Sequence, residues 1–298
     1  MSGAVPHESR SVLRTGKRSL ARPAVLAAAM LVFGLVAVAA ELKARTAEAF
    51  NKYVAATEAR MAGELKPGGE FLYLDHPAAA ASEEMRDGFA RLKRGEILVE
   101  RQETRLDGKE VEVPDGMVHH WVGLIFIPGV SLKQTLAVAR DYDHRAELYK
   151  PEVIAAHTIS HQGDDYKIFL RLYQRRFTTV AFNTEYAIHW GQVDSGKVYS
   201  NSISTRIAQI KDAAHPDGPE YAVGEGNGYL WRLNTYWRFQ ESDGGVYVQC
   251  EALSLTRDIP FGLGWLIKPL VTKIPKQSLN SALGRTREAV LEKIAASH

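Results

Sequence analysis

The sequence contains one cysteine, Cys250, so an intramolecular disulfide is excluded whatever the compartment. Cys250 lies in the middle of an alternating run, residues 246–255, which is typical of a β-strand. We therefore expect it to be a small, buried, apolar residue. A reactive thiol is the alternative interpretation, although no basic residue stands beside Cys250 in the sequence to depress its pKa.

A strong net charge is also missing from the body of the chain. The sequence holds 37 basic and 35 acidic residues, but five of the basic residues and only one acid lie in residues 1–40. Without these residues the balance is 32 basic against 34 acidic side chains, a net charge of −2. A nearly neutral chain lacks the excess of basic side chains that binding to a phosphate backbone requires, so we predict no nucleic-acid partner.

The common catalytic and metal-binding motifs are missing as well. The sequence has no HExxH pair and no GxSxG nucleophile elbow. His119 and His120 are neighbours on a predicted strand, where successive side chains point to opposite faces, so we expect one to face solvent and one the interior. The glycine-rich stretch 224–228 precedes a strand and not a helix, which excludes a phosphate-loop interpretation. We predict no metal, no cofactor and no catalytic constellation.

The first 40 residues have the three parts of a secretory signal peptide. A basic region ends at Arg22, an apolar run covers residues 24–40, and small residues precede Glu41 as a cleavage site requires. The run is short for a bilayer span, which needs about 20 residues, so cleavage is favoured over retention. We expect an exported protein, periplasmic or secreted, or alternatively one anchored to the membrane by residues 24–40.

The remaining chain predicts an α+β fold. Apolar spacing indicates a helix over 42–65, and Ser82 suits the N-cap of a second helix ending near Arg94, so residues 41–95 are interpreted as a helical arm. Residues 96–298 are interpreted as one ligand-binding domain. Ser131 starts a helix, a short helix follows near residue 145, and Ser278 opens a long amphipathic helix. Strands are expected at 96–106, 117–127, 153–161, 166–177, 179–190, 197–210, 224–239 and 246–257.

The last two strands form a predicted β-hairpin, because Asp243-Gly244 separates two alternating runs. A short loop there places Trp237 opposite Cys250 and Tyr236 opposite Glu251. Large side chains then share one face with small ones, which leaves room beneath the aromatic rings. This face carries Tyr229, Trp231, Leu233, Trp237 and Phe239 with Val248, Cys250 and Ala252. The other face carries Arg232, Asn234, Tyr236 and Arg238 with Gln249 and Glu251.

Three segments carry a resemblance to a known superfamily. Residues 130–153 carry motifs and predicted elements in the order Pro-Gly, helix, Asp-Tyr-Asp, helix and Pro-Glu-Val. The strand Trp237-Arg-Phe239 follows, and Arg257-Asp-Ile-Pro260 then leads into the terminal helix. Over residues 117–296 the chain resembles the START/Bet v 1-like (SRPBCC) superfamily, which includes polyketide cyclase-like and coenzyme Q-binding proteins. The resemblance implies a helix-grip fold, a curved antiparallel sheet around a long C-terminal helix, with a cavity between them for an apolar or amphipathic molecule.

The resemblance and the hairpin pattern together predict a ligand site. We expect an apolar lining and a polar end, as ligand pockets usually have. The predicted lining is Tyr229, Trp231, Trp237 and Phe239, and the predicted polar groups are Arg206, Glu225 and Arg232. Glu251 has two interpretations: a cross-strand charge pair, or a fourth member of that polar end.

Three functions remain open from the sequence. The leading hypothesis is an exported binding protein for a lipid-like or other hydrophobic small molecule. The first alternative is a cyclase- or dehydratase-like enzyme that uses Glu225 or Glu251 in the cavity. The second is a structural envelope protein whose cavity is filled by its own side chains. The apolar stretch 261–267 is interpreted as a flexible lead-in to the helix; the alternatives are a gate over the cavity mouth or a loop in transient membrane contact.

Overall fold

The computed structural model describes residues 40–175, 179–258 and 264–296, without the side chains of 264–272. The predictions for the leader and for the apolar stretch 261–267 lie outside the described side chains. Residues 39–298 form one compact unit. Within the described part of the chain, none of the helices combines the length and apolar composition that a bilayer span needs.

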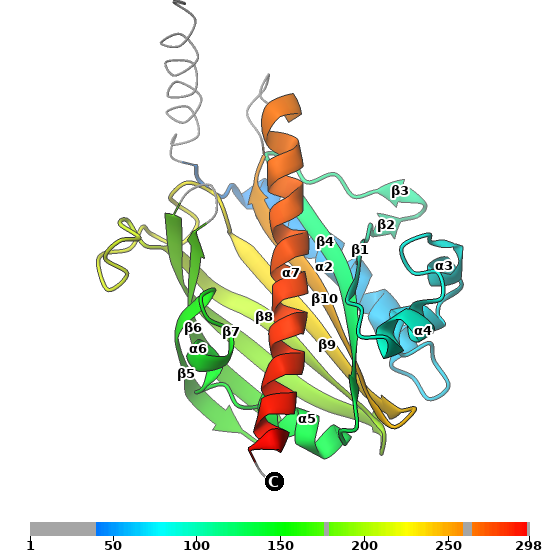
Figure 1. Ribbon diagram of the computed structural model, residues 1–298. Helices are drawn as coiled ribbons and strands as arrows, with labels where there is room; N and C mark the ends of the chain where they lie inside the picture. The colour runs from blue at the N-terminus through cyan, green and yellow to red at the C-terminus, as the bar shows by residue number, and fades with distance from the viewer. Residues whose placement is uncertain (1–39, 176–178, 259–263, 297–298) are drawn as a thin grey trace, which may run out of the picture. The chain divides into compact units, whose positions relative to one another are not determined.

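One antiparallel sheet of eight strands forms the centre of this unit, in the order β1-β4-β10-β9-β8-β7-β6-β5 (Figure 1). A separate small hairpin joins β2 to β3. The strands are β1 Leu98–Arg101, β2 Arg105–Leu106, β3 Lys109–Glu110, β4 Gly116–Pro128, β5 Val153–Gln162, β6 Asp165–Arg175, β7 Thr179–Asp194, β8 Lys197–Gln209, β9 Arg232–Ser242 and β10 Gly245–Arg257.

The predicted hairpin register is confirmed. Trp237 pairs with Cys250, and Tyr236 pairs with Glu251. At the turn, Asp243 has φ 57° and Gly244 has φ 75°. Positive φ at both central residues is the type I′ geometry that matches the twist of the two strands, and Asp-Gly adopts it readily.

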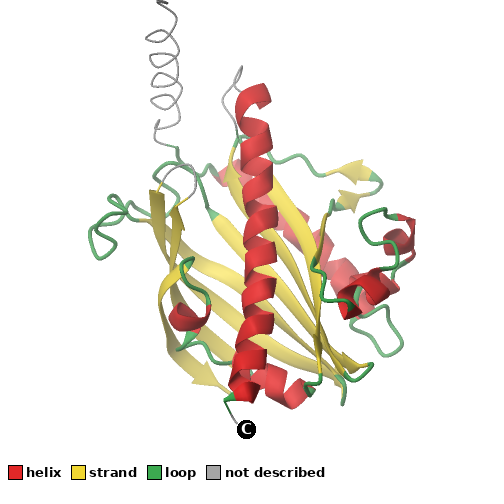
Figure 2. Cartoon of the chain, viewed as in Figure 1, coloured by secondary structure: helices red, strands yellow, loops and turns green. Residues whose placement is uncertain are grey.

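The C-terminal helix α7, Gly264–Ala295, lies along the concave face of the sheet, which curves around it (Figure 2). The helix begins before Ser278, where it was predicted to start. It packs mainly against β4, with further contacts to α5 and β1. Gly123 of β4 permits this approach, because a Cβ there would lie only 2.6 Å from Leu283 Cδ1. The predicted helix-grip fold class is therefore confirmed, and α5 Leu132–Ala139 and α6 Arg145–Leu148 complete the inner layer.

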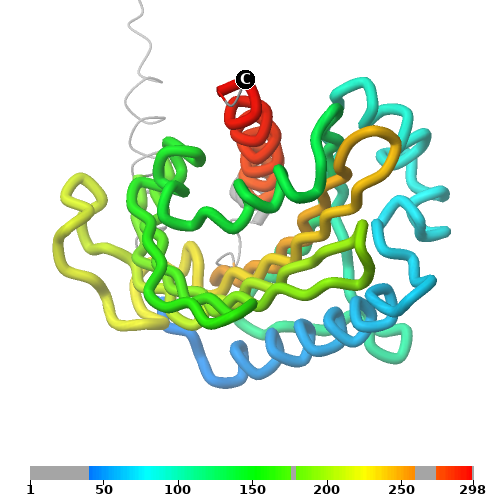
Figure 3. Tube along the Cα trace, turned by 90° about the horizontal axis from the view of Figure 1, so that it is seen from below, coloured from blue at the N-terminus to red at the C-terminus, as the bar shows by residue number. Residues whose placement is uncertain are grey.

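The convex face is covered by the N-terminal segment. Helix α2, Ala44–Glu64, lies beneath the sheet on the side opposite α7 (Figure 3). Its apolar residues join a buried cluster with β9 and β10, and the following segment packs against β4 and β10. That segment contains η1 Tyr73–Asp75, α3 Pro77–Ala81 and α4 Gly88–Lys93. Ser82 is the C-cap of α3 and not the predicted N-cap, and the next helix, α4, begins only at Gly88.

Candidate functional site

Small side chains line the concave face of the central strands. Trp237 of β9 lies between Ser200 of β8 and Cys250 of β10. Leu233 pairs with Ser254 of β10. Each large side chain thus has small neighbours on the adjoining strand, as predicted from the hairpin. Small side chains also lie across the strands between Trp237 and Leu233. These are Ser202, Thr235 and Ala252, which pair with one another.

The large side chains on this surface are only partly covered. Trp237, Leu233 and Leu170 pack against the inner apolar cluster, yet each remains half-buried. By contrast, Trp190 and Phe239, near α5, are almost fully buried at 2% and 1% exposure. The concave face is therefore tightly packed near α5 and less covered over the middle of β6 and β9.

Two buried polar groups belong to the same face. The Tyr186 hydroxyl makes no hydrogen bond within the described part of the chain. Burial raises the pKa of Tyr186 to about 12. His119 lies 3.1 Å from the Thr256 hydroxyl. Burial, aided by the charge of Arg101, lowers the pKa of His119 to about 4, so its ring is neutral at pH 7.

The predicted aromatic lining divides between the two faces of the sheet. Trp237 and Phe239 lie together on the concave face with stacked rings 6.3 Å apart. Trp231 instead packs in the cluster under α2 on the convex face. The strand begins only at Arg232, after an irregular stretch with three positive-φ glycines, so the alternation assumed for Trp231 does not hold. Tyr229 packs against a small cluster that contains Phe182.

The predicted polar end does not form. Arg206 pairs with Glu220, and Glu225 is exposed in a loop. Arg232 donates to the carbonyl of Trp231 at 2.8 Å, and burial lowers its pKa. The prediction that these three residues meet Glu251 at one end of the cavity is therefore wrong. Ligand contact by the individual residues stays a prediction.

Glu251 lies under α2, on the convex face. It is 2% exposed, accepts a hydrogen bond from His120 Nε2 at 2.6 Å and pairs with Arg60 of α2. Tyr53 of α2 accepts from the Thr104 N–H, so its own proton goes to His120 Nδ1, 2.8 Å away. Burial would raise the pKa of Glu251, but the His120 hydrogen bond and the nearby charges of Arg60 and Arg238 hold it below its usual value.

A second buried carboxylate completes this network. Glu64 of α2 is 2.5 Å from both Arg60 and Arg238, and Arg238 also donates to the carbonyl of Phe71 at 2.6 Å. Two carboxylates thus balance two guanidinium groups beneath the helix. This covering explains why His120 is buried, at 3% exposure, while His119 points to the concave face and is also buried, at 4% exposure. The expectation that one of the two histidines faces solvent is therefore wrong.

Sequence reasoning missed the α2 side of this network. Arg60 and Glu64 are spaced as an ordinary i,i+4 surface pair, which gives no sign of a partner on the last hairpin. Cys250, by contrast, is buried as predicted, and burial raises the pKa of its thiol well above the ordinary value, which opposes the reactive-thiol alternative. Within the described residues, no three side chains of His, Cys, Asp or Glu are placed to hold a metal ion.

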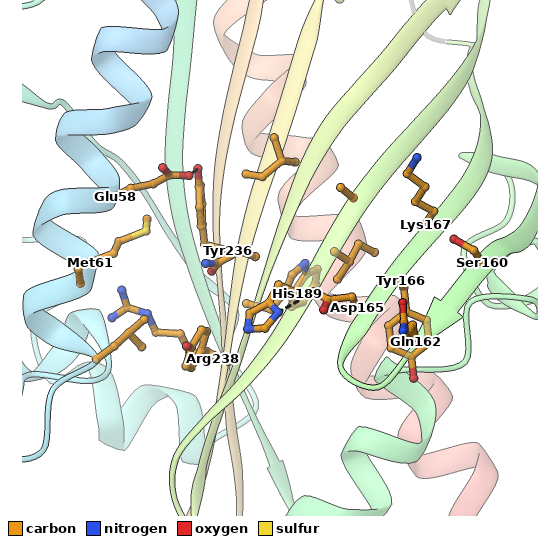
Figure 4. Close-up of a pocket in the computed structure, with 18 residues that line it drawn as sticks. Glu58, Met61, Ser160, Gln162, Asp165, Tyr166, Lys167, His189, Tyr236 and Arg238 are labelled. Atoms are coloured by element: carbon orange, nitrogen blue, oxygen red, sulfur yellow. Dashed lines mark hydrogen bonds and ion pairs between the residues drawn. The ribbon is translucent and has the colours of Figure 1, made fainter.

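The convex face also carries a groove of about 730 Å³ (Figure 4). One wall is the C-terminal half of α2, including Met61 and Leu65, and the floor is the outer face of β5 to β9. None of the predicted site residues except Trp237 lines this groove. The groove therefore lies on the face opposite the concave surface, and it borders the ion network at Arg238.

No family model matches this chain, and no curated protein matches it. Among solved structures, the chain is similar to a STAR-related lipid transfer protein fragment from Xanthomonas axonopodis, with 15% identity, a TM-score of 0.45, and coverage of 65% of this chain and 93% of that one. Human STARD10 gives 12% identity, a TM-score of 0.45, and coverage of 71% and 80%. The Zhui aromatase/cyclase from Streptomyces sp. R1128 gives 6% identity, a TM-score of 0.40, and coverage of 60% and 96%. These values carry no functional assignment; the helix-grip arrangement rests on the sheet and α7 themselves.

Proposed function

We propose that the protein binds a hydrophobic, lipid-like small molecule on the concave face of the sheet, beside α7. The observation that carries this proposal is the position of Trp237 and Leu233 above small residues, with both large side chains half-buried in the inner layer. Exposed apolar area of this kind is stabilised by an apolar occupant at about 25 cal/mol per Å² covered.

The chemistry of the surface favours a ligand without a charged group. By strand register, the described inward-facing positions of β6, β7 and β8 hold no acidic or basic side chain. An ionised group there would lose its hydration without a partner. The hydroxyls of Tyr186, Ser200 and Ser202 would serve an uncharged polar end, such as a hydroxyl or a carbonyl.

Neither alternative function has comparable support. Glu251, the carboxylate considered for catalysis, lies on the opposite face with a lowered pKa, and Glu225 is exposed. A general acid near neutral pH needs a raised pKa instead. A fully self-filled core would bury Trp237 and Leu233 as completely as Phe239.

The cellular setting is part of the proposal. The leader pattern of residues 1–40 supports export to the periplasm or beyond, with retention as an anchor as the other outcome. Transient membrane contact through residues 261–267 would let an apolar ligand enter without crossing water.

Filling the floor of the proposed site tests the assignment. Ser202→Leu would place a branched side chain between Thr235 and Ile188 on the concave face. We expect at least a tenfold loss of affinity for Nile red, a neutral apolar dye, measured by its fluorescence. The matched control is Ser160→Leu, whose side chain lies on the outer face and should leave dye binding unchanged. Equal dye binding by wild type and Ser202→Leu, with both variants folded by circular dichroism, would place the ligand elsewhere.

A further inference from the structure

A row of hydrogen-bonding side chains crosses the convex face in register. Gln162 of β5 pairs with Asp165 of β6, and Asp165 pairs with His189 of β7. His189 pairs with Asn201 of β8, and Asn201 pairs with Tyr236 of β9. All five residues line the groove beside α2 (Figure 4). At about 4.8 Å between strands, the row extends over roughly 19 Å.

Two groups in this row are free to bind a ligand, because the side-chain amides of Gln162 and Asn201 make no hydrogen bond within the described residues. The hydroxyl of Tyr199, which lines the same groove, makes none there either. Other members are already oriented by partners: His189 Nδ1 lies 2.8 Å from Asp165 Oδ1, and the Tyr236 hydroxyl donates to Glu58 at 2.7 Å. The groove thus presents both fixed and unoccupied hydrogen-bonding groups.

Flat apolar surfaces stand beside this polar row. The ring of Tyr199 covers Gly191 of β7, where a Cβ would lie only 2.3 Å from the ring. Any side chain at position 191 would displace the ring, so the glycine allows Tyr199 to lie against the sheet. Met61 and Ile203 add aliphatic surface on the wall and the floor.

We propose that this groove is a second binding site, for a neutral saccharide. Side-chain amides and a neutral imidazole can both donate to and accept from the hydroxyls of a sugar ring, and a carboxylate accepts from them. The apolar C–H face of a sugar ring would pack on Tyr199 and Met61, since an aromatic ring offers a rigid apolar surface.

The charges of the groove argue for a neutral sugar and against an acidic one. Two basic residues, Lys167 and Arg238, and two acids, Asp165 and Glu58, line the groove. Because Arg238 is already paired with Glu64 and the two acids offset Lys167, an anionic ligand gains no net attraction. The groove volume of about 730 Å³ lies in the usual range for small-molecule sites. The site is independent of the concave ligand surface, so either can be present without the other.

The test uses the full chain and a panel of neutral tetrasaccharides built from glucose, galactose or N-acetylglucosamine. Saturation-transfer NMR detects binding, and calorimetry measures the affinity of each sugar that binds. We expect at least one neutral sugar to bind, and the double variant Asn201→Ala/Gln162→Ala to weaken it at least tenfold. The matched control is Asn51→Ala, an exposed amide on α2 outside the groove, which should leave the affinity unchanged.

Three results would overturn the proposal. The first is the absence of binding by any neutral sugar at millimolar concentration. The second is unchanged affinity in the double variant when thermal unfolding shows that it is folded. The third is preferential binding of an acidic oligogalacturonate that is lost in Lys167→Ala, which would assign the groove to anions.

Discussion

The sequence pattern places Glu251 on the polar side of a hairpin, but the structure buries it. It lies on the polar side of an alternating hairpin, where a cross-strand pair near solvent was one of the two interpretations. Helix α2 removes it from water and surrounds it with His120, Arg60 and Arg238. A buried carboxylate of this kind is tolerated only because its partners remain in place.

Replacing Glu251 with glutamine should therefore be strongly destabilising. The substitution keeps the shape but leaves Arg60 and Arg238 with one buried negative partner, Glu64, in place of two. Breaking a buried pair in this way costs about 3–5 kcal/mol of unfolding free energy. Urea denaturation at pH 7 measures the loss, and Glu83→Gln, at an exposed acid, should change the stability by less than about 0.5 kcal/mol.

The loss should also depend on pH, and its sign follows from the lowered pKa of Glu251. Because the folded-state pKa lies below the unfolded value, the ionised carboxylate stabilises the fold above the unfolded value of 4.5. That contribution disappears as the pH falls through the folded pKa, where wild type becomes protonated too. The stability difference between wild type and Glu251→Gln should be constant above pH 4.5 and shrink below it. A difference that grew on acidification would contradict the assigned ion network.

At the scale of elements, two glycines should respond in opposite directions to alanine. At Gly123 the new methyl would lie 2.6 Å from Leu283, which is fully buried, so Gly123→Ala should cost about 1–3 kcal/mol by overpacking. Gly63 lies in α2 with nothing within 4 Å of a Cβ, so Gly63→Ala should stabilise by about 0.5–1 kcal/mol.

A double-mutant cycle identifies the cause of the first effect. In a Leu283→Ala background the space over Gly123 opens, and most of the loss caused by Gly123→Ala should disappear. Urea titration of the four variants measures this coupling. Purely additive losses would mean that α7 does not rest on β4 through this contact.

The hairpin and the arm show what the sequence could and could not predict. The register of β9 and β10 was predictable because the turn residues and the alternating pattern are local signals. The position of α2 was not, because its ties to the sheet pair residues far apart in the chain, such as Tyr53 with His120 and Glu64 with Arg238.

The two tryptophans predicted for the site also show that only local, regular patterns could be interpreted from the sequence. Trp237 was placed on the correct face because it stands inside a regular strand. Trp231 was misplaced because glycines 224, 226 and 228 interrupt the pattern just before β9. Alternation can assign a face only where the strand is continuous.

At the scale of the whole molecule, one sheet separates two different surfaces. The concave surface is uncharged over β6 to β8 and carries the proposed hydrophobic site, with α7 as its lid. On the convex side, α2 lies along the sheet (Figure 3). This helix covers the ion network, and the proposed saccharide groove lies beside its C-terminal half. The two proposed ligands would therefore lie on opposite faces of the sheet.

The central claim is that the concave face holds a hydrophobic, uncharged small molecule. Native mass spectrometry of the full chain, purified gently from the cells that produce it, tests this claim most directly. We predict an added mass that is released on denaturation, extracts into organic solvent, carries no fixed charge and is missing from Ser202→Leu. A wild-type protein that stays ligand-free after incubation with a lipid extract of the same cells, or a mass retained equally by Ser202→Leu, would contradict it.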